Sequence, residues 1–238
     1  MAHMDANLTT MAPVAVVTGG NRGLGFEVCR QLQAIDYYVV LGSREGAAGR
    51  EAAQLLGERV TGIQLDVTDQ ASVDAAAGWV LDRFGRCDTL VNNAGVGYDT
   101  DELASAADLA RVERALETNL FGTWRVCLAF LPMLSRSPQA RIVNVSSREA
   151  SLTAMGGGKP GYHVSKTAQN ALTRTLAAEL HDRSILVNAI SPGWTATDMG
   201  GRGGRPVADG AASIVWGVTL SEDGPSGGFF EDGQPVPW

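Results

Sequence analysis

Cysteine and histidine are scarce in this sequence. There are three cysteines (Cys29, Cys87 and Cys127) and three histidines, all widely separated, and no C-x-x-C pair occurs. Disulfide frameworks and Cys/His metal sites need ligands at close, characteristic spacings. We therefore expect no metal, and we interpret the thiols as small core residues of a protein in the reducing cytoplasm.

Long apolar runs and an excess of positive charge are also lacking. The sequence has no run of about eighteen or more apolar residues, so no membrane span is expected. No basic segment followed by an apolar one opens the chain, so no secretory signal is predicted. The net charge of −7 argues against nucleic acid as the main partner. These absences predict a cytoplasmic protein without a nucleic-acid or membrane partner.

Residues 1–11, MAHMDANLTTM, are polar and carry no periodic apolar pattern. We expect a disordered leader or a remnant of an expression tag there, and we exclude it from the fold. Residues 12–238 show no break in composition and no internal repeat. A chain of this length fits one α/β domain, which we predict over residues 12–238.

Short β-branched runs alternate with segments of helical spacing along the chain. The run VAVVT at 14–18 is typical of a buried parallel strand. Strands separated by helices form right-handed crossovers, which predicts a parallel sheet covered by helices on both faces. The expected strands are 14–18, 37–42, 60–66, 88–95, 140–147, 185–193 and 227–230, and the expected helices are 24–35, 47–56, 71–84, 108–134, 162–182 and 208–217.

Polar and Gly-rich stretches follow most of the expected strands. In a sheet of this kind, ligands bind where the carboxyl ends of the strands meet. We therefore expect these stretches to converge on one edge: TGGNRGLG, GSR, LDV, NNAG, VSS and SPGWTATDM.

The turn TGGNRGLG after the first strand carries glycines at 19, 23 and 25. This spacing differs from the G-x-G-x-x-G fingerprint, but the turn has the same place, between a first strand and a helix. Glycine allows the backbone to approach a pyrophosphate, and the helix N-terminus offers N–H groups to the anion. The turn therefore predicts nucleotide binding.

The second strand ends in GSR, without an acidic residue until Glu45. An acid at this place holds the ribose 2′-hydroxyl of NAD, whereas an arginine accommodates the 2′-phosphate of NADP. Arg44 lies there, and Arg22 lies in the Gly-rich turn. Two guanidiniums are well suited to bind a phosphate, so the pattern favours NADP(H). The alternative is that Arg44 is a loop residue exposed to solvent, without a role in binding.

The sequence YHVSK places Tyr162 and Lys166 four residues apart at the start of an expected helix. Residues at i and i+4 are neighbours on one helix face. An ammonium beside a phenol favours the phenolate, so we expect Lys166 to lower the pKa of Tyr162 and create a proton donor for neutral pH. An ordinary helix surface is the alternative for the pair alone.

In order and spacing, the motifs TGGNRGLG, LDV, NNAG, TNLFG, NVSS, YHVSK and SPGWTATDM resemble those of the short-chain dehydrogenase/reductase family over nearly the whole chain. The GGN of the first turn, PGWTATDM and the ending GPSGGFFEDGQPVPW resemble its carbonyl-reductase branch. The resemblance implies a single-domain Rossmann fold, a doubly wound parallel sheet of about seven strands in the order 3-2-1-4-5-6-7.

The resemblance implies four catalytic residues. Tyr162 would protonate the carbonyl oxygen, and Lys166 would lower the pKa of Tyr162 and hold the nicotinamide ribose. Ser147, rather than Ser146, would hydrogen-bond the substrate carbonyl. Asn119 would hold a water that supplies protons to Lys166. From the residue alone, a purely structural role for this helical asparagine is equally consistent with the sequence.

The resemblance also implies the residues that line NADP(H). Asp66 would contact the adenine, although an aspartate there also starts turns. The whole expected set is Gly19, Asn21, Arg22, Gly23, Leu24, Gly25, Ser43, Arg44, Asp66, Val67, Asn93, Ala94, Gly95, Tyr162, Lys166, Pro192, Gly193, Trp194, Thr195 and Thr197.

The implied activity is the reversible NADPH-dependent reduction of ketones or aldehydes, with a small carbonyl compound or alcohol as substrate. Two alternatives stay open: a 3-oxoacyl or polyketide ketoreductase, and a non-catalytic NADP(H)-binding sensor. The Gly-rich stretch 200–206 predicts a short lid over an open pocket. Members of the family often pair through the helices expected at 108–134 and 162–182, so a dimer, a tetramer and a monomer all stay open.

Overall fold

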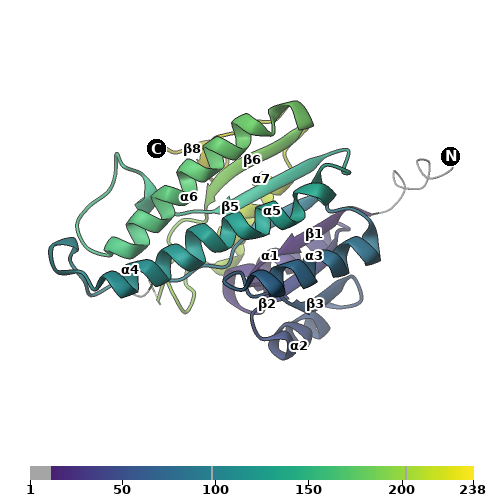
Figure 1. The fold of residues 1–238 in the computed structure, drawn as a ribbon, viewed down its shortest axis with the longest axis horizontal. Helices are drawn as coiled ribbons and strands as arrows, with labels where there is room; N and C mark the ends of the chain where they lie inside the picture. The colour runs from purple at the N-terminus through teal and green to yellow at the C-terminus, as the bar shows by residue number, and fades with distance from the viewer. Residues whose placement is uncertain (1–11, 98, 202) are drawn as a thin grey trace.

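Eight strands form one sheet in the computed structural model, which describes residues 12–97, 99–201 and 203–238 (Figure 1). Their order is β3-β2-β1-β4-β5-β6-β7-β8, and all neighbours are parallel except β7 and β8. The strands are β1 Val14–Val17, β2 Tyr38–Ser43, β3 Val60–Gln64, β4 Thr89–Asn92, β5 Ala140–Val145, β6 Ile185–Ser191, β7 Phe229–Glu231 and β8 Gln234–Pro235. The predicted Rossmann fold and strand order are confirmed.

The eighth strand was not predicted from the sequence. It pairs antiparallel with β7 through a hairpin whose two turn residues, Asp232 and Gly233, both have positive φ. Asp-Gly is a preferred sequence for such a turn. The strand has two residues and contains Pro235, so it has no apolar alternation from which it could be recognised.

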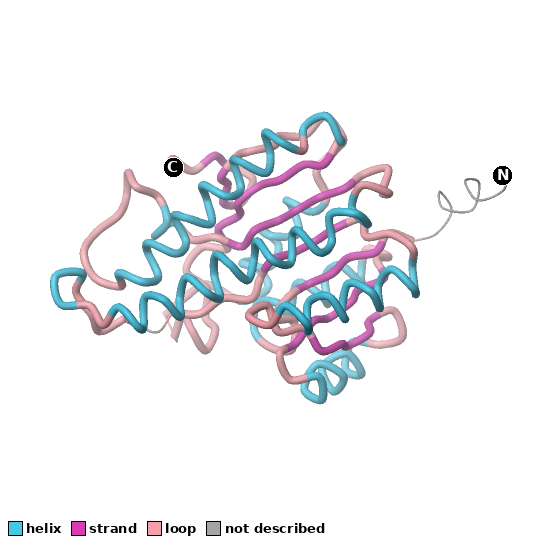
Figure 2. Tube along the Cα trace, viewed as in Figure 1, coloured by secondary structure: helices cyan, strands magenta, loops and turns pink. Residues whose placement is uncertain are grey.

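Helices cover both faces of the sheet (Figure 2). One face carries α3, α4, α5 and α6, and the other carries α1, α2 and α7. The helices are α1 Gly23–Ala34, α2 Gly46–Leu56, α3 Gln70–Phe84, α4 Leu109–Leu116, α5 Thr123–Leu134, α6 Pro160–Glu179 and α7 Val207–Val218. Short 3₁₀ turns lie at η1 Ala104–Ala106, η3 Arg148–Ala150 and η4 His181–Arg183.

Alternate residues of the strands supply two separate cores. Val14 and Val16 of β1 pack toward α3, α5 and α6, whereas Ala15 and Val17 pack toward α1, α2 and α7. The period of two along a strand accounts for this division. Because both faces are buried, β1 is apolar throughout rather than alternating.

The helix expected over 108–134 is interrupted by a π-helical segment, η2 Glu117–Gly122, between α4 and α5. Such segments are rare inside helices and often lie at functional sites. A Cβ on Gly122 would lie 2.7 Å from Cγ2 of Val67, so the segment passes close to the turn that follows β3. The π segment contains Asn119, which is fully buried.

The expected leader, residues 1–11, lies outside the described residues. Among those that are described, no helix is long and apolar enough to span a membrane. Cys29, Cys87 and Cys127 are free and buried, as predicted.

Candidate active site

The Gly-rich turn after β1 is tied to the turn after β4. The Thr18 hydroxyl accepts hydrogen bonds from the backbone N–H groups of Asn93 (3.0 Å) and Ala94 (2.9 Å). The Asn93 amide donates to the carbonyl oxygens of Thr18 (2.9 Å) and Gly19 (3.1 Å). A Cβ on Gly25 would lie 2.4 Å from the Asn93 amide nitrogen, which leaves room for glycine only. The structure therefore brings TGGNRGLG and NNAG together.

The N-terminus of α1 offers free N–H groups at this turn. Arg22 precedes the helix and gives it no side-chain cap, and its first turn, all of it described, has no acidic residue. Gly19 and Gly23 have φ of +63° and +55°, values that glycine adopts readily. Uncapped N–H groups and the helix dipole bind phosphate. Asn21, Gly23, Leu24 and the neighbouring glycines therefore fit a dinucleotide pyrophosphate.

The two arginines expected to bind a 2′-phosphate differ in their surroundings. Arg44 follows the buried Ser43 at the end of β2 and is exposed. Within the described residues it makes no ion pair or hydrogen bond. Arg22 Nη1 pairs with Asp198 Oδ2 at 2.8 Å, and both side chains are largely exposed. The Arg22–Asp198 pair joins the first turn to the segment after β6.

Asp66 starts a turn after β3. Its Oδ1 accepts hydrogen bonds from the Thr68 N–H (3.0 Å) and the Thr68 hydroxyl (2.8 Å), while its own N–H donates to Ser72 Oγ (3.0 Å). The turn-forming reading of Asp66 is thus confirmed. It holds Asp66 and the buried Val67 at the carboxyl edge of the sheet, where the contact with adenine stays a prediction.

The segment after β6 is folded back on itself. Thr195 and Arg205 form a parallel bridge, and the Arg205 N–H donates to the Trp194 carbonyl (2.8 Å). A Cβ on Gly204 would lie 2.4 Å from the carbonyl carbon of Thr195, so the two arms pack closely. The described part of the expected Gly-rich lid, 200–206, is therefore a packed loop; Arg202 lies outside the described residues.

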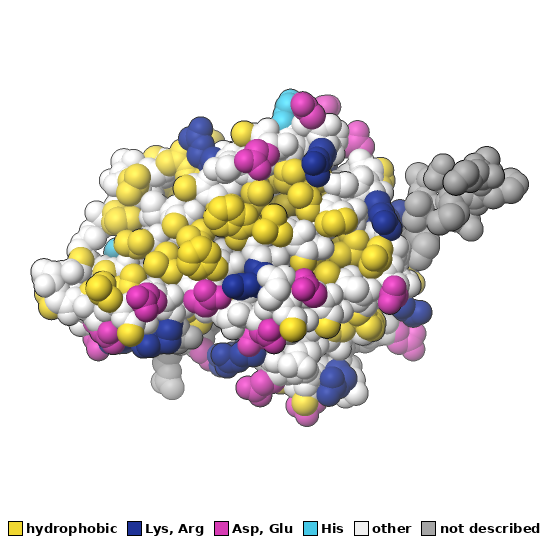
Figure 3. All heavy atoms as spheres, viewed as in Figure 1, with side chains coloured by type: hydrophobic (Ala, Val, Ile, Leu, Met, Phe, Trp, Pro, Cys, Tyr) yellow, Lys and Arg dark blue, Asp and Glu magenta, His cyan; other side chains and the backbone are white. Residues whose placement is uncertain are grey.

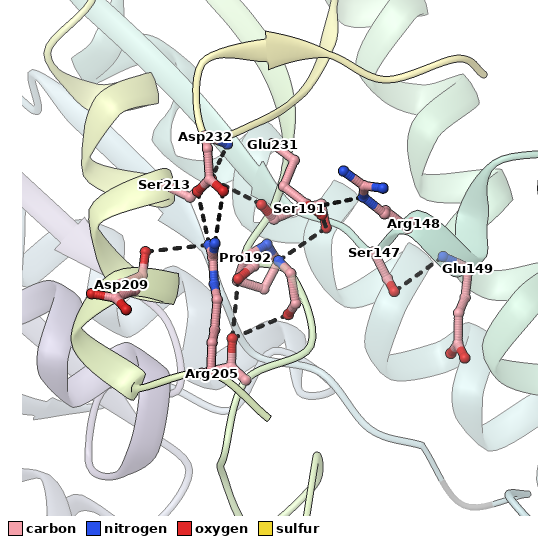
Figure 4. A network of polar contacts seen from close by, with 12 residues as sticks. Ser147, Arg148, Glu149, Ser191, Pro192, Arg205, Asp209, Ser213, Glu231 and Asp232 are labelled. Atoms are coloured by element: carbon pink, nitrogen blue, oxygen red, sulfur yellow. Dashed lines mark hydrogen bonds and ion pairs between the residues drawn. The ribbon is translucent and has the colours of Figure 1, made fainter. Parts of the chain in front are cut away.

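The C-terminal hairpin holds both arms of this loop (Figure 4). Glu231 Oε2 accepts a hydrogen bond from the Ser191 hydroxyl (2.6 Å), whose oxygen accepts one from the Gly193 N–H (3.2 Å). The Asp232 carboxylate binds the Arg205 guanidinium through two hydrogen bonds of 2.7 and 2.9 Å. These contacts fix the turn at Gly193, where φ is +67°.

The loop side chains expected near the nicotinamide take different positions. The Thr195 hydroxyl donates to the Pro192 carbonyl (3.1 Å) and is buried. Thr197 faces the first turn, where a Cβ on Gly23 would lie 3.8 Å from its Cγ2. Trp194 is 66% exposed, and its indole N–H donates to the Gly200 carbonyl (2.7 Å). Trp194 is thus engaged within the loop.

The two serines after β5 have different environments. Ser146 is buried, and its hydroxyl donates to Asn170 Oδ1 on α6 (2.7 Å). Ser147 precedes η3, its Oγ accepts from the Glu149 N–H (3.2 Å), and the residue lies close enough to Tyr162 to lower the pKa of the phenol. This geometry favours Ser147 over Ser146 as the residue beside Tyr162.

Tyr162 lies in the first turn of α6, as predicted. Part of its side chain reaches solvent, but desolvation around the hydroxyl raises its pKa to about 12, against a lowering by the Ser147 hydrogen bond and a further raising by Glu149. Burial is the largest influence on the pKa of Tyr162 in this structure and Lys166 is not among its causes, so the expected lowering by Lys166 stays a prediction. Tyr162 therefore holds its proton at neutral pH.

Lys166 and Asn119 approach each other beside the turn after β4. A Cβ on Gly95 would lie 3.3 Å from Asn119 Oδ1 and 3.5 Å from Lys166 Nζ. Asn119 Oδ1 accepts from the Val96 N–H (2.8 Å), and its Nδ2 donates to the Val96 carbonyl (2.9 Å) and Ser165 Oγ (2.9 Å). Burial lowers the pKa of Lys166 to about 8. The structure thus brings together all four predicted catalytic residues.

Three contacts around the site were missed from the sequence. Gln169 accepts a hydrogen bond from Lys166, Asp99 binds the first N–H groups of α6, and Asp232 holds Arg205. The spacing of Gln169, three residues after Lys166 on the same helix, was a usable signal. The other two contacts join distant parts of the chain and left no local trace.

A doubly wound sheet with a phosphate-binding turn at its carboxyl edge defines a Rossmann-type dinucleotide-binding protein. Residues 13–205 match the model of the short chain dehydrogenase family. The chain belongs to this family, and it is accordingly an oxidoreductase acting on alcohol and carbonyl groups.

The similar proteins are reductases and dehydrogenases. The chain is 31% identical to mouse carbonyl reductase [NADPH] 1, over 97% of this chain and 100% of that protein. It is 34% identical to (+)-neomenthol dehydrogenase of Arabidopsis thaliana, over 92% and 96%. Among solved structures, NADPH-bound carbonyl reductase from chicken fatty liver superposes with a TM-score of 0.86 at 28% identity, covering 96% of this chain and 100% of that one.

Proposed function

We propose that this protein is an NADPH-dependent carbonyl reductase that converts a ketone or aldehyde to the alcohol. The observation that carries the proposal is the meeting of Ser147, Tyr162, Lys166 and Asn119 beside the dinucleotide-binding turn. The similarity to mouse carbonyl reductase [NADPH] 1 over the whole of both chains supports it.

The bound nicotinamide would supply the hydride, and the protein supplies position and protons. Charge develops on the carbonyl oxygen as the bond to carbon is reduced. Ser147 and Tyr162, which lie close enough for Ser147 to lower the pKa of Tyr162, would both donate to that oxygen. The raised pKa of Tyr162 keeps its proton in place until the oxygen becomes basic enough to take it.

Lys166 would replenish this proton. Its ammonium is buried one helical turn from Tyr162, beside Asn119, and its pKa of about 8 lets it give up a proton near neutral pH. Asn119, fixed by three hydrogen bonds, would position the water that returns the proton. These proposed roles would give a proton route from a water at Asn119 through Lys166 to Tyr162.

NADPH is the proposed cofactor in preference to NADH. Arg44 after β2, which is exposed and has no ion pair among the described residues, and Arg22 in the first turn supply two guanidiniums for a 2′-phosphate. Arg22 would exchange its exposed partner Asp198 for the phosphate, since an exposed ion pair is weak.

The test is the loss of NADPH absorbance with a panel of ketones and aldehydes, for the wild type and Tyr162→Phe. We expect turnover by the wild type, a loss of about a thousandfold or more in Tyr162→Phe, and NADPH binding by both in a fluorescence titration. NADH should support at most a tenth of the rate. Near-native turnover by Tyr162→Phe would refute its role as the acid.

The same experiment separates the alternative functions. Turnover only with carrier-linked 3-oxoacyl substrates would indicate a ketoreductase of that class. Tight NADPH binding without turnover of either kind of substrate would indicate a sensor.

We also propose that a second copy of the chain covers the apolar face of α5 and α6. Figure 3 shows hydrophobic side chains gathered on this side of the molecule. Phe121, Trp124 and Leu128 lie along one helical stripe and are 46%, 42% and 59% exposed, and Val164 of α6 is 51% exposed. Contiguous apolar surface of this kind marks protein interfaces.

A further inference from the structure

A fully buried glutamine lies one turn beyond Lys166 on α6. Gln169 Oε1 accepts a hydrogen bond from Lys166 Nζ at 3.1 Å, and its side chain has no exposure to solvent. The second acceptor of the ammonium is the Val145 carbonyl of β5, at 2.8 Å. Lys166 is therefore held by two neutral oxygens, one from a strand and one from its own helix.

The orientation of the Gln169 amide is determined by its other contact. Gln169 Nε2 donates to Thr123 Oγ1 (2.9 Å), and the Thr123 hydroxyl proton is committed to the Asn119 carbonyl (2.9 Å). Thr123 can therefore only accept from Gln169. The amide nitrogen must face Thr123, so the amide oxygen must face Lys166.

An ammonium has three N–H donors. Two of them donate to Gln169 and Val145, so the third N–H can point toward the active site. Gly95 opens space there, since a Cβ on it would lie 3.5 Å from Nζ. The two oxygens thus aim the remaining N–H at the side of Lys166 where Gly95 and Asn119 lie.

We propose that Gln169 is a positioning residue for catalysis, which orients the Lys166 ammonium and, because it carries no charge, leaves that group free to release its proton during turnover. The proposal rests on the proposed role of Lys166 in proton supply. It adds a residue that acts through Lys166 and, by way of Thr123, ties it to the π segment that carries Asn119.

The charges of the groups around Lys166 are compatible with Gln169 as an uncharged hydrogen-bond partner. On α6 the titratable residues within one turn of Lys166 are Tyr162 and His163. Glu149, from η3, acts on Tyr162 and pairs with Lys159 (2.6 Å). The neighbours from β5, the π segment and the turn after β4 are uncharged. Burial alone lowers the pKa of Lys166, to about 8, and no carboxylate among the described residues opposes it.

The test compares Gln169→Glu, Gln169→Met and a control, Thr173→Val. In Gln169→Glu a carboxylate beside the ammonium favours its charged form, so the alkaline limb of kcat should move up by about one pH unit or more. In Gln169→Met the ammonium loses its acceptor, so the limb should move to lower pH and kcat at pH 7 should fall about tenfold. NADPH binding should persist in both.

The control separates positioning from general damage. The Thr173 hydroxyl donates to the Gln169 carbonyl and accepts from Asn144, so Thr173→Val disturbs the same buried network without touching Lys166. It should lower stability and keep the wild-type pH profile. A second readout needs no activity: the gain in unfolding free energy that Lys166 gives the cofactor-free protein over Lys166→Met from pH 8 to 9 should fall to about a third or less in the Gln169→Glu background.

If both Gln169 variants kept the wild-type kcat and the wild-type alkaline limb of the pH profile, the inference would be overturned, and the proposed function would stand. A shift of the limb in Thr173→Val equal to that in Gln169→Met would also overturn it, since the effect would then be structural. Failure of the proposed function is recognised separately, by full activity of Tyr162→Phe.

Discussion

Tyr162 and Lys166 have pKa values displaced in opposite directions by the same cause. Burial disfavours the charged form of each group, so the pKa of the phenol rises to about 12 and that of the ammonium falls to about 8. A general acid must keep its proton until the substrate needs it, and a donor that resupplies it must release one readily. Burial of the pair serves both needs.

The pKa of Lys166 predicts a change of stability with pH. Between about 8 and the ordinary value of 10.5, the unfolded chain binds more protons at Lys166 than the native protein, so the unfolding free energy rises with pH. Three buried thiols, whose ordinary pKa of 9.0 is raised by burial, act in the opposite direction from about pH 8 upward. The contribution of Lys166 is therefore measured as a difference from a variant that keeps the three thiols.

We expect the unfolding free energy of the wild type to gain about 1 kcal/mol over Lys166→Met from pH 8 to 9. Urea denaturation of both proteins at each pH measures the difference. Parallel pH dependences would show that Lys166 stays charged, or stays neutral, throughout this interval.

Among the helices, α6 depends on another part of the chain for its N-terminus. Its preceding residue, Lys159, has φ of +49° and gives no side-chain cap. Asp99, buried in the loop after β4, accepts hydrogen bonds from the N–H groups of Gly161 and Tyr162 (3.3 Å to the latter). A carboxylate also suits the positive end of a helix. Asp99 thus anchors the turn that carries Tyr162.

Asp99→Ala should destabilise the protein by about 1–3 kcal/mol, because two buried N–H groups lose their acceptor. It should also lower kcat more than it changes KM, since the first turn of α6 becomes less ordered. Asp108→Ala is the matched control: Asp108 caps α4 through the Ala110 N–H (3.0 Å). Urea denaturation and steady-state kinetics should show a stability loss with unchanged kcat there; an equal kcat loss in both variants would contradict the anchoring role.

For the whole molecule, the proposed dimer can be tested at the exposed apolar stripe on α5. A dimer would bury Trp124 and Leu128, whose exposure in one chain is 42% and 59%. We expect sedimentation velocity to show a dimer for the wild type and a monomer for Trp124→Glu with Leu128→Glu, since a buried unpaired carboxylate is costly. Leu55→Glu, on α2 and 80% exposed, should stay dimeric. A monomeric wild type would contradict this interface.

Much of the fold could be predicted because it depends on local patterns. Apolar runs such as β1 and the turn residues that follow them determine alternating strands and helices, and right-handed crossovers then give a parallel sheet covered on both faces, whereas the strand order was implied by the family resemblance. The π segment at Asn119 and the strand β8 could not be predicted in this way, since neither changes the apolar periodicity around it.

The sequence by itself determined which groups this protein has for chemistry and where they lie: glycines after a first strand, and Tyr162 and Lys166 one helical turn apart. Only the tertiary structure decided how these groups behave. Gln169 meets Thr123 across 46 residues, and Asp99 meets Gly161 across 62. Burial, which sets the pKa values of Tyr162 and Lys166, depends on packing between such distant segments, and local sequence carries no record of it.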